Sequence, residues 1–205
     1  MKFLLGRKIG MSQVFDPSGA VVPVTFIEAG PVTVTQIRTK EKDGYVAAQV
    51  GFGTKSAKNL AKAQKGHFKD LGNFRITREF RPRTETSLPN IGDKVDVSVF
   101  KEGDTVKIAG TSKSKGFQGV VKRHGFRGAP ATHGTKHALR EPGSVGGAGT
   151  RSHIIKGTRM AGRMGGERVT IEGLKIVKID PEQNILAVTG AVPGIPGSLL
   201  EITAE

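Results

Sequence analysis

Between Thr111 and Arg168 the chain concentrates side chains that bind polyanions. Twelve lysines and arginines lie in this stretch against two acidic residues, so it carries +10 of the chain's net charge of +14. The other residues include 20 basic and 16 acidic side chains, an ordinary balance for a folded domain. Nucleic acid and anionic membrane surfaces are the two candidate partners for such a charge. Lysine and arginine gain affinity for nucleic acid by displacing the counterions condensed on phosphates.

Glycine and histidine in the same stretch favour RNA. It holds 13 of the 29 glycines and four of the five histidines. Glycine lets the backbone enter crowded grooves and bring its amides to phosphates, while arginine and histidine can stack on unpaired bases. No helix-turn-helix or zinc-finger pattern is visible, and an irregular arm suits a folded RNA better than a duplex groove. The residues that we predict to bind RNA are Lys113, Lys115, Lys122, Arg123, His124, Arg127, His133, Lys136, His137, Arg140, Arg151, Lys156, Arg159, Arg163 and Arg168.

A solvated linker is the alternative interpretation of this stretch. Its glycine and charge content would leave it extended in isolation, because it buries too little apolar surface to offset its ordering entropy. Linkers rarely hold hydrophobic anchors, however. Here apolar residues recur at intervals, and we expect them to be packing points of a defined arm: Phe117, Val120, Val121, Phe126, Ile154, Ile155, Met160 and Met164.

Two local patterns resemble sites of other kinds. His133 and His137 are four residues apart, as on a metal-binding helix face, but the surrounding glycines disfavour a helix. The segment from Gly110 to Gly116 misses the spacing of a nucleotide-binding phosphate loop and is more credible as a phosphate contact in RNA. We therefore predict no metal and no cofactor.

The acidic residues form no recognisable catalytic pattern. We find no paired acids and no nucleophile beside a base, so we predict no catalytic residue and no enzyme activity. Glu167 is expected to form an ion pair with Arg163 or Arg168.

Most of the remaining chain is predicted to form short β-strands. β-branched runs alternate with Gly and Pro, which favours a small antiparallel barrel or a sandwich. Pro23 indicates an edge or a bulge, and residues 181–184 indicate a hairpin turn. The expected strands are Ala20–Glu28, Val32–Arg38, Tyr45–Phe52, Val95–Phe100, Thr105–Ala109, Leu174–Asp180 and Ile185–Val192.

One segment of this body reads as a helix. Ser56–Asp70 has the pattern of a short amphipathic helix that ends at Gly66, within a small insert over residues 55–90. Five lysines line it, and they form either a solvated face or a second RNA contact: Lys55, Lys58, Lys62, Lys65 and Lys69.

Cysteine is absent, which excludes disulfides, thiolate zinc sites and thiol catalysis. The apolar run near the N-terminus is too short for a signal peptide, and no run approaches the roughly 20 apolar residues of a membrane span. We expect a cytoplasmic chain without a membrane partner.

Several motifs, taken in order, are specific. They are Leu5-Gly6-Arg7-Lys8-Ile9-Gly10-Met11, Gly66-His67-Phe68, the block from Gly110 to Arg123, Pro142-Gly143-Ser144-Val145-Gly146, Lys156-Gly157-Thr158-Arg159-Met160-Ala161-Gly162, Glu167-Arg168-Val169-Thr170 and Gly190-Ala191-Val192-Pro193-Gly194. Through them the chain closely resembles the bacterial large-subunit ribosomal protein three family over essentially its whole length.

The resemblance implies a fold and a setting. It implies a closed antiparallel β-barrel resembling translation-factor barrels, over residues 1–110 and 167–205, with the small α-containing insert at 55–90. A long basic extension over residues 111–166, with its base at 110–124 and its tip at about 125–163, would reach through rRNA toward the peptidyl transferase centre. Family members bind large-subunit rRNA early in assembly beside large-subunit proteins fourteen and nineteen, and they have no small-molecule substrate.

One position departs from the family pattern. Some members carry a methylated glutamine where this chain has Gly149, so that modification is not expected here. We favour a structural rRNA-binding protein, with two rivals: a free-standing RNA chaperone or annealing protein, and a nucleotide- or metal-dependent enzyme acting on RNA.

Overall fold

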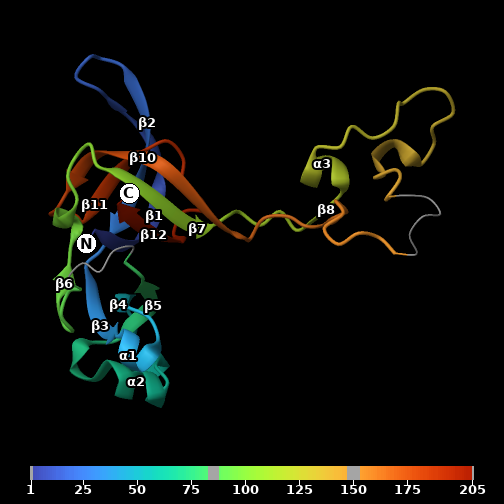
Figure 1. The fold of residues 1–205 in the computed structure, drawn as a ribbon. Helices are drawn as coiled ribbons and strands as arrows, with labels where there is room; N and C mark the ends of the chain where they lie inside the picture. The colour runs from blue at the N-terminus through green and yellow to red at the C-terminus, as the bar shows by residue number, and fades with distance from the viewer. Residues whose placement is uncertain (1, 83–87, 147–152, 205) are drawn as a thin grey trace. The chain divides into compact units, whose positions relative to one another are not determined.

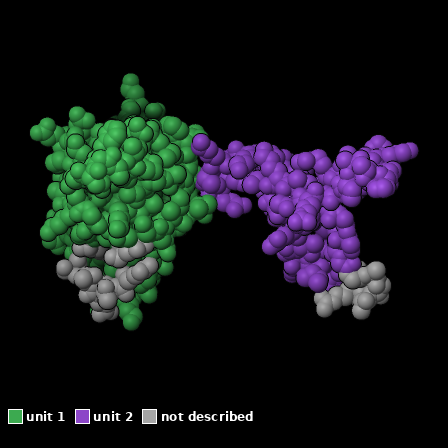
Figure 2. Space-filling model, turned by 90° about the horizontal axis from the view of Figure 1, so that it is seen from above, with its two compact units in different colours: residues 1–111, 168–205 green, residues 112–167 purple. Residues whose placement is uncertain are grey.

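The computed structural model describes residues 2–82, 88–146 and 153–204. The chain forms two compact units, one of residues 1–111 and 168–205 and the other of residues 112–167 (Figure 2). We refer to them as unit 1 and unit 2. Unit 2 is inserted in the sequence between two strands that pair with each other in unit 1, with Thr111 opposite Arg168.

Unit 1 is built around six antiparallel strands (Figure 1). They pair in the order β1-β12-β7-β10-β11-β2, and β2 pairs again with β1, so the ring of strands is closed into a barrel. The expectation of a mainly-β fold is confirmed. The strands are β1 (Phe3–Phe15), β2 (Val21–Ala29), β7 (Thr105–Thr111), β10 (Arg168–Asp180), β11 (Ile185–Thr189) and β12 (Leu199–Ala204).

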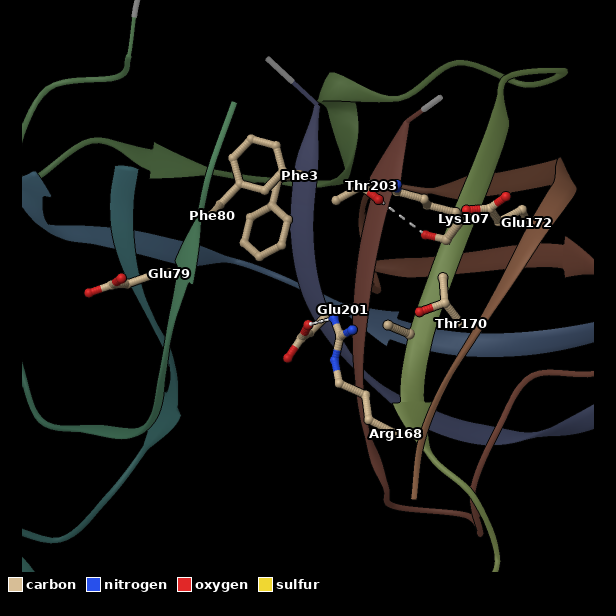
Figure 3. Close-up of a pocket in the computed structure, with 10 residues that line it drawn as sticks. Phe3, Glu79, Phe80, Lys107, Arg168, Thr170, Glu172, Glu201 and Thr203 are labelled. Carbon is tan, nitrogen blue, oxygen red and sulfur yellow. Dashed lines mark hydrogen bonds and ion pairs between the residues drawn. The ribbon is translucent and has the colours of Figure 1, made fainter. Parts of the chain in front are cut away.

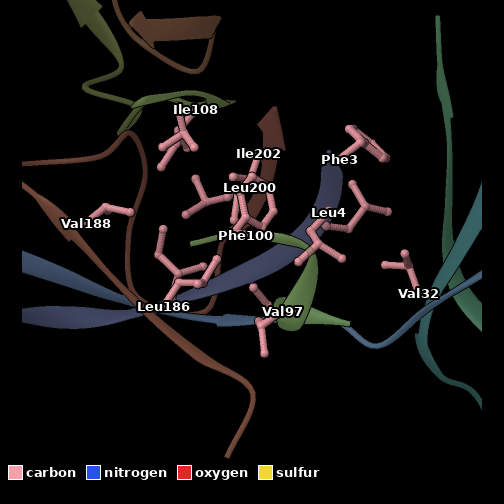
Figure 4. Close-up of a cluster of buried hydrophobic side chains, with 14 of the residues drawn as sticks. Phe3, Leu4, Val32, Val97, Phe100, Ile108, Leu186, Val188, Leu200 and Ile202 are labelled. Carbon is pink, nitrogen blue, oxygen red and sulfur yellow. The ribbon is translucent and has the colours of Figure 1, made fainter. Parts of the chain in front are cut away.

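The core of unit 1 is aliphatic, with a few phenylalanines. Alternate strand residues point inward, and Leu4, Ile108, Leu186, Leu200 and Ile202 are completely buried (Figure 4). Burying a side chain of this size stabilises the fold by about 1.5–3 kcal/mol.

A second sheet belongs to unit 1. Its four strands lie in the order β5-β4-β3-β6, and the short helices between them are α1 (Lys40–Asp43), η1 (Ala57–Asn59), α2 (Lys62–Phe68) and η2 (Lys69–Leu71). The strands are β3 (Val32–Arg38), β4 (Ala47–Thr54), β5 (Phe74–Phe80) and β6 (Lys94–Val95). Phe3 of the barrel stacks on Phe80 of this sheet, with ring centroids 4.5 Å apart.

The predicted helix over Ser56–Asp70 is shorter and interrupted. It divides into η1, α2 and η2, and Gly66 lies inside α2 rather than at its end. Only Leu60 and Phe68 of this segment are buried. Two buried side chains therefore anchor it, instead of the continuous apolar face that we expected. Four of the five lysines are exposed, and Lys55 is half-buried.

Most predicted strands occur close to their expected bounds, with one clear error. Val95–Phe100 is not a strand: β6 ends at Val95 and Val97–Val99 form the 3-10 helix η3. The predicted turn at residues 181–184 is confirmed, since the Asp180 carboxylate accepts the backbone N–H groups of Glu182 and Gln183. Pro23 lies just beyond the part of β2 that pairs with β11, as expected for an edge position.

No helix in the three described ranges of the chain is long and apolar enough to cross a membrane.

Candidate nucleic-acid interface

Unit 2 begins and ends in a two-stranded ladder. The N–H of Ser112 donates to Glu167 O, Lys115 N–H to Met164 O, and Met164 N–H to Gly116 O, each at 2.9 Å. Strands β8 (Phe117–Gln118) and β9 (Gly162–Arg163) continue the pairing, with Phe117 opposite Arg163. Backbone hydrogen bonds therefore hold the two ends of the basic stretch side by side.

Glycine is required where the two segments approach. Gly165 has a φ of 73°, and a Cβ at this position would lie closer than 3.0 Å to the carbonyl oxygen of Lys113. A Cβ on Gly162 would lie 2.8 Å from Arg123 Nη1, so that end of the flexible arginine side chain would have to shift. The glycine content of the stretch is thus partly a packing requirement.

A short helix follows the ladder. Helix α3 (Val120–His124) buries Val120 and ends at Gly125, whose φ of 73° places it in the left-handed region and whose N–H donates to Val121 O. Its last turn contains Lys122, Arg123 and His124, and positive charge there is favoured by the helix dipole.

Two of the predicted RNA-binding side chains have a partner within unit 2. Arg123 Nη1 donates to the carbonyl oxygen of Met160 at 2.6 Å, and His124 Nε2 lies 3.0 Å from the same oxygen. Both side chains are half-buried. They join α3 to the returning segment, so at least part of their hydrogen-bonding capacity serves the structure of unit 2.

The segment after α3 doubles back on itself. Ala129 N–H donates to Leu139 O at 3.2 Å, and Gly128 lies against the same carbonyl. The 3-10 helix η4 (Ala138–Arg140) follows, and Glu141 N–H closes it on Ala138 O. Phe126, Arg127, Pro142 and Glu141 line a shallow hollow here.

The two spaced histidines are not on a helix. His133 lies in a turn with a φ of 58°, and His137 immediately precedes η4. Both side chains are exposed. In the described part of the chain no group of three or more His, Asp or Glu side chains could hold a metal ion.

Nine predicted RNA-binding cations of unit 2 are exposed and have no described carboxylate within salt-bridge distance. All five salt bridges between described residues lie in unit 1. Arg151, which we also predict to bind RNA, and Gly149 lie outside the described residues. The nine are Lys113, Lys115, Lys122, Arg127, Lys136, Arg140, Lys156, Arg159 and Arg163.

The expected packing role of the apolar residues is only partly correct. Val120 is buried, and Val121, Phe126, Met160 and Met164 are half-buried. Three others point to solvent: Phe117, at 76% exposure, Ile154 and Ile155. Unit 2 is too small and glycine-rich to cover them, so they are free to contact a partner.

Taken together, the ladder, the glycine contacts and the unpaired cations form a framework that presents positive charge. The family model that matches the chain, over residues 83–194, is described as ribosomal protein L3. A large ribosomal subunit protein uL3 from Chloroherpeton thalassium is 51% identical over 208 residues, covering 100% of both chains. The chain belongs to the ribosomal protein L3 family.

Two further L3-family relatives are similar over nearly the whole chain. The uL3 protein of Roseiflexus sp. (strain RS-1) is 51% identical over 97% of this chain and 95% of its own, and that of Cutibacterium acnes is 49% identical over 98% and 91%. The resemblance stated from the motifs is confirmed. This family is a structural component of the ribosome, which confirms that the chain is a ribosomal protein rather than an enzyme.

One predicted RNA-binding residue of this L3-family chain lies in unit 1. Arg168 begins β10, and its Nη2 donates to Glu201 Oε2 at 2.6 Å (Figure 3). Glu201 Oε1 accepts from Arg78 Nε at 3.1 Å. Glu201 therefore bridges two arginines, from β10 and from β5. The expected ion pair of Glu167 with Arg163 or Arg168 is wrong: none of the five salt bridges between described residues involves Glu167, and Arg168 contacts Glu201.

Proposed function

We propose that this chain is a structural constituent of the large ribosomal subunit and that unit 2 binds large-subunit rRNA. The observation that carries the proposal is the charge balance of the two units: unit 2 has 11 basic and two acidic residues, whereas unit 1 has 21 basic and 16 acidic residues. In unit 1, Lys2, Arg38, Arg78 and Arg168 are paired with carboxylates. In unit 2 the nine exposed cations have no such partner among the described residues.

Unpaired cations on a framework with little core need an external polyanion. Self-repulsion among them destabilises the compact state in water, and phosphates relieve it while counterions are released. The relatives named above are large-subunit proteins, which supports rRNA as that polyanion.

Further features of the proposal come from the family resemblance. The extension would brace rRNA near the peptidyl transferase centre, and the chain would bind early in assembly beside large-subunit proteins fourteen and nineteen. Its barrel would correspond to the translation-factor type of barrel, and its location would be the large ribosomal subunit in the cytoplasm. Functionally, residues 1–110 and 167–205 would be the body, with the insert at 55–90, and residues 111–166 the rRNA-binding part.

Charge reversal in unit 2 tests the proposal. We choose Lys113, Lys115, Lys122 and Arg127 for replacement by Glu, because all four are exposed. Loss of four phosphate contacts should lower the log–log salt slope of rRNA binding by roughly three. The chain should then no longer co-sediment with large subunits in high salt.

A matched control changes the net charge equally in unit 1. Lys40, Lys42, Lys94 and Lys101 are also exposed, and their replacement by Glu should lower the slope much less. Equal loss in both variants would mean that net charge alone attracts the RNA, and the proposal would be rejected. Wild-type protein that washes off large subunits in high salt would instead support an RNA chaperone.

A further inference from the structure

The hairpin of β1 and β2 ends in a stretch with an unusual composition for this chain. Residues 9–25 contain no lysine, arginine or histidine and a single acid, Asp16, although the whole chain carries +14. Lysine and arginine supply most of a protein's affinity for phosphates. This end of the hairpin is therefore unsuited to the RNA that unit 2 is proposed to bind.

One face of the hairpin end carries three exposed apolar side chains, with the polar Gln13 between two of them. Residues directly opposite in an antiparallel pair share a face, and Met11 lies opposite Thr25, Gln13 opposite Pro23 and Phe15 opposite Val21. Met11, Phe15 and Val21 are 53%, 66% and 54% exposed. They form a stripe along the ribbon, which extends past the other barrel strands in Figure 1.

The outer edge of β1 along this stripe is unpaired. Strand β12 pairs with β1 only from Phe3 to Arg7, and Lys8 N–H still donates to Ser198 O. From Gly10 to Phe15, β1 pairs only with β2 among the described strands. In an antiparallel strand, alternate backbone N–H and C=O groups point away from the partner, so this edge offers free donors and acceptors.

The two edges of the hairpin end differ in a way that singles out β1. Proteins protect exposed edges with lysine or proline, and Pro23 does so on β2 because it has no N–H. On β1, the six residues Gly10–Phe15 include neither residue type. An edge without such protection can accept a strand from another chain.

We propose that the edge of β1 from Gly10 to Phe15 receives an extended segment of another polypeptide, which adds a strand to the hairpin. The apolar side chains of that segment pack on Met11, Phe15 and Val21. A second copy of this chain is disfavoured because two chains of net charge +14 repel each other. The inference rests on the proposed function, since the partner is then another protein of the same subunit.

Site-specific photo-crosslinking identifies the occupant. A benzophenone amino acid replaces Phe15 in the full chain, the chain is assembled into large subunits, and adducts are analysed after irradiation and nuclease digestion. The expected product is a nuclease-resistant adduct with a different polypeptide. The control places the same probe at Ser12, which is exposed but lies opposite Val24 on the other face, and should give a several-fold lower yield.

Hydrogen exchange measures the added strand directly. The outward-facing amides between Gly10 and Phe15 should exchange roughly tenfold or more slowly in the subunit than in the free chain. The Met11→Lys, Phe15→Lys variant should lose this protection, while its barrel amides exchange as in wild type because both side chains are exposed.

The outcomes separate the inference from the proposed function. If wild type enters the subunit but its Phe15 probe couples to RNA, to a second copy or to nothing, or if these amides are not protected, strand addition is wrong and rRNA binding stands. If wild type does not enter the subunit, both are wrong.

Discussion

Gly165 lies against Lys113 with no room for a side chain between them, because a Cβ on Gly165 would come closer than 3.0 Å to the Lys113 carbonyl oxygen. The contact sits in the ladder where the basic stretch begins and returns. A residue without a side chain therefore sets how closely the two segments approach, and with it the spacing of the cations on both.

The first prediction is that Gly165→Ala weakens rRNA binding without unfolding unit 1. The methyl group forces the segments apart, and the φ of 73° adds about 1–2 kcal/mol of strain. The matched control is Gly116→Ala, which has a φ of 71° but nothing within 4 Å of the added Cβ. Filter binding at fixed salt should show a clearly larger loss for Gly165→Ala, and equal losses would mean that strain alone matters.

Phe117 provides a second test. The ring is 76% exposed, and it lies opposite Arg163 in the β8–β9 pair. An exposed aromatic ring among cations suits stacking on an unpaired base, so Phe117→Ala should cost about 1–3 kcal/mol of rRNA affinity. The melting temperature of the Phe117→Ala variant should equal that of wild type. As a control, Ile195→Ala removes an exposed apolar side chain of unit 1 and should leave rRNA affinity unchanged. If Phe117→Ala binds rRNA as tightly as wild type, stacking by Phe117 is excluded.

The pairing of Arg168 with Glu201 predicts a structural role for an arginine first assigned to RNA binding. Glu201→Gln breaks the bridge to both Arg168 and Arg78 and should lower the free energy of unfolding by about 1 kcal/mol or less at low salt. Added salt should reduce the difference. Denaturation of Glu201→Gln, Arg168→Gln and the double variant measures the coupling. Additive losses would show that the pair contributes no coupling to stability.

Acid sensitivity is predicted at Asp104. The hydrogen bond from Lys2 Nζ, with a second from Lys101 N–H, holds the pKa of the Asp104 carboxyl below its usual range. A lowered folded-state pKa gives stability that is present above the unfolded-state pKa of about 3.9 and lost as pH falls through the folded-state pKa. Asp104→Asn should therefore destabilise the protein most near neutral pH, and the difference from wild type should shrink in acid.

Urea unfolding at several pH values checks this dependence. Asp70→Asn, which changes an exposed acid without a described salt bridge, serves as the control and should show little difference at any pH. A constant penalty for Asp104→Asn across the pH range would contradict the assignment.

Strands with strong β-branched runs were predictable because their pattern is local. Val32–Arg38 has the same bounds in the sequence prediction and in the structure. By contrast β1 was missed, since its run from Phe3 to Phe15 is interrupted by glycines and cations. Its pairing with β2 and β12, not its propensity, makes it a strand.

Composition could indicate which part of the chain binds RNA but not which side chains are free to do so. Charge and glycine locate the stretch, whereas the contacts of Arg123 and His124 with Met160 depend on how the chain folds back across 36 or more residues. The exposure of Phe117 was also unpredictable, because an apolar residue in a basic segment fits packing and stacking equally well. No local signal marks Glu201 as the partner of Arg168, which is 33 residues away.

The central claim is that the inserted basic stretch carries the rRNA affinity. Gln118 and Gly162 are paired across β8 and β9, so a two-residue Asn-Gly turn can replace residues 119–161 and close the ladder. The replacement removes eight lysines and arginines. The decisive measurement is the log–log salt dependence of large-subunit rRNA binding for wild type and this variant, with cooperative unfolding checked for both. We predict a slope lower by at least about three, the value for half of the removed cations. An unchanged slope, or a variant whose barrel no longer unfolds cooperatively, would contradict the account.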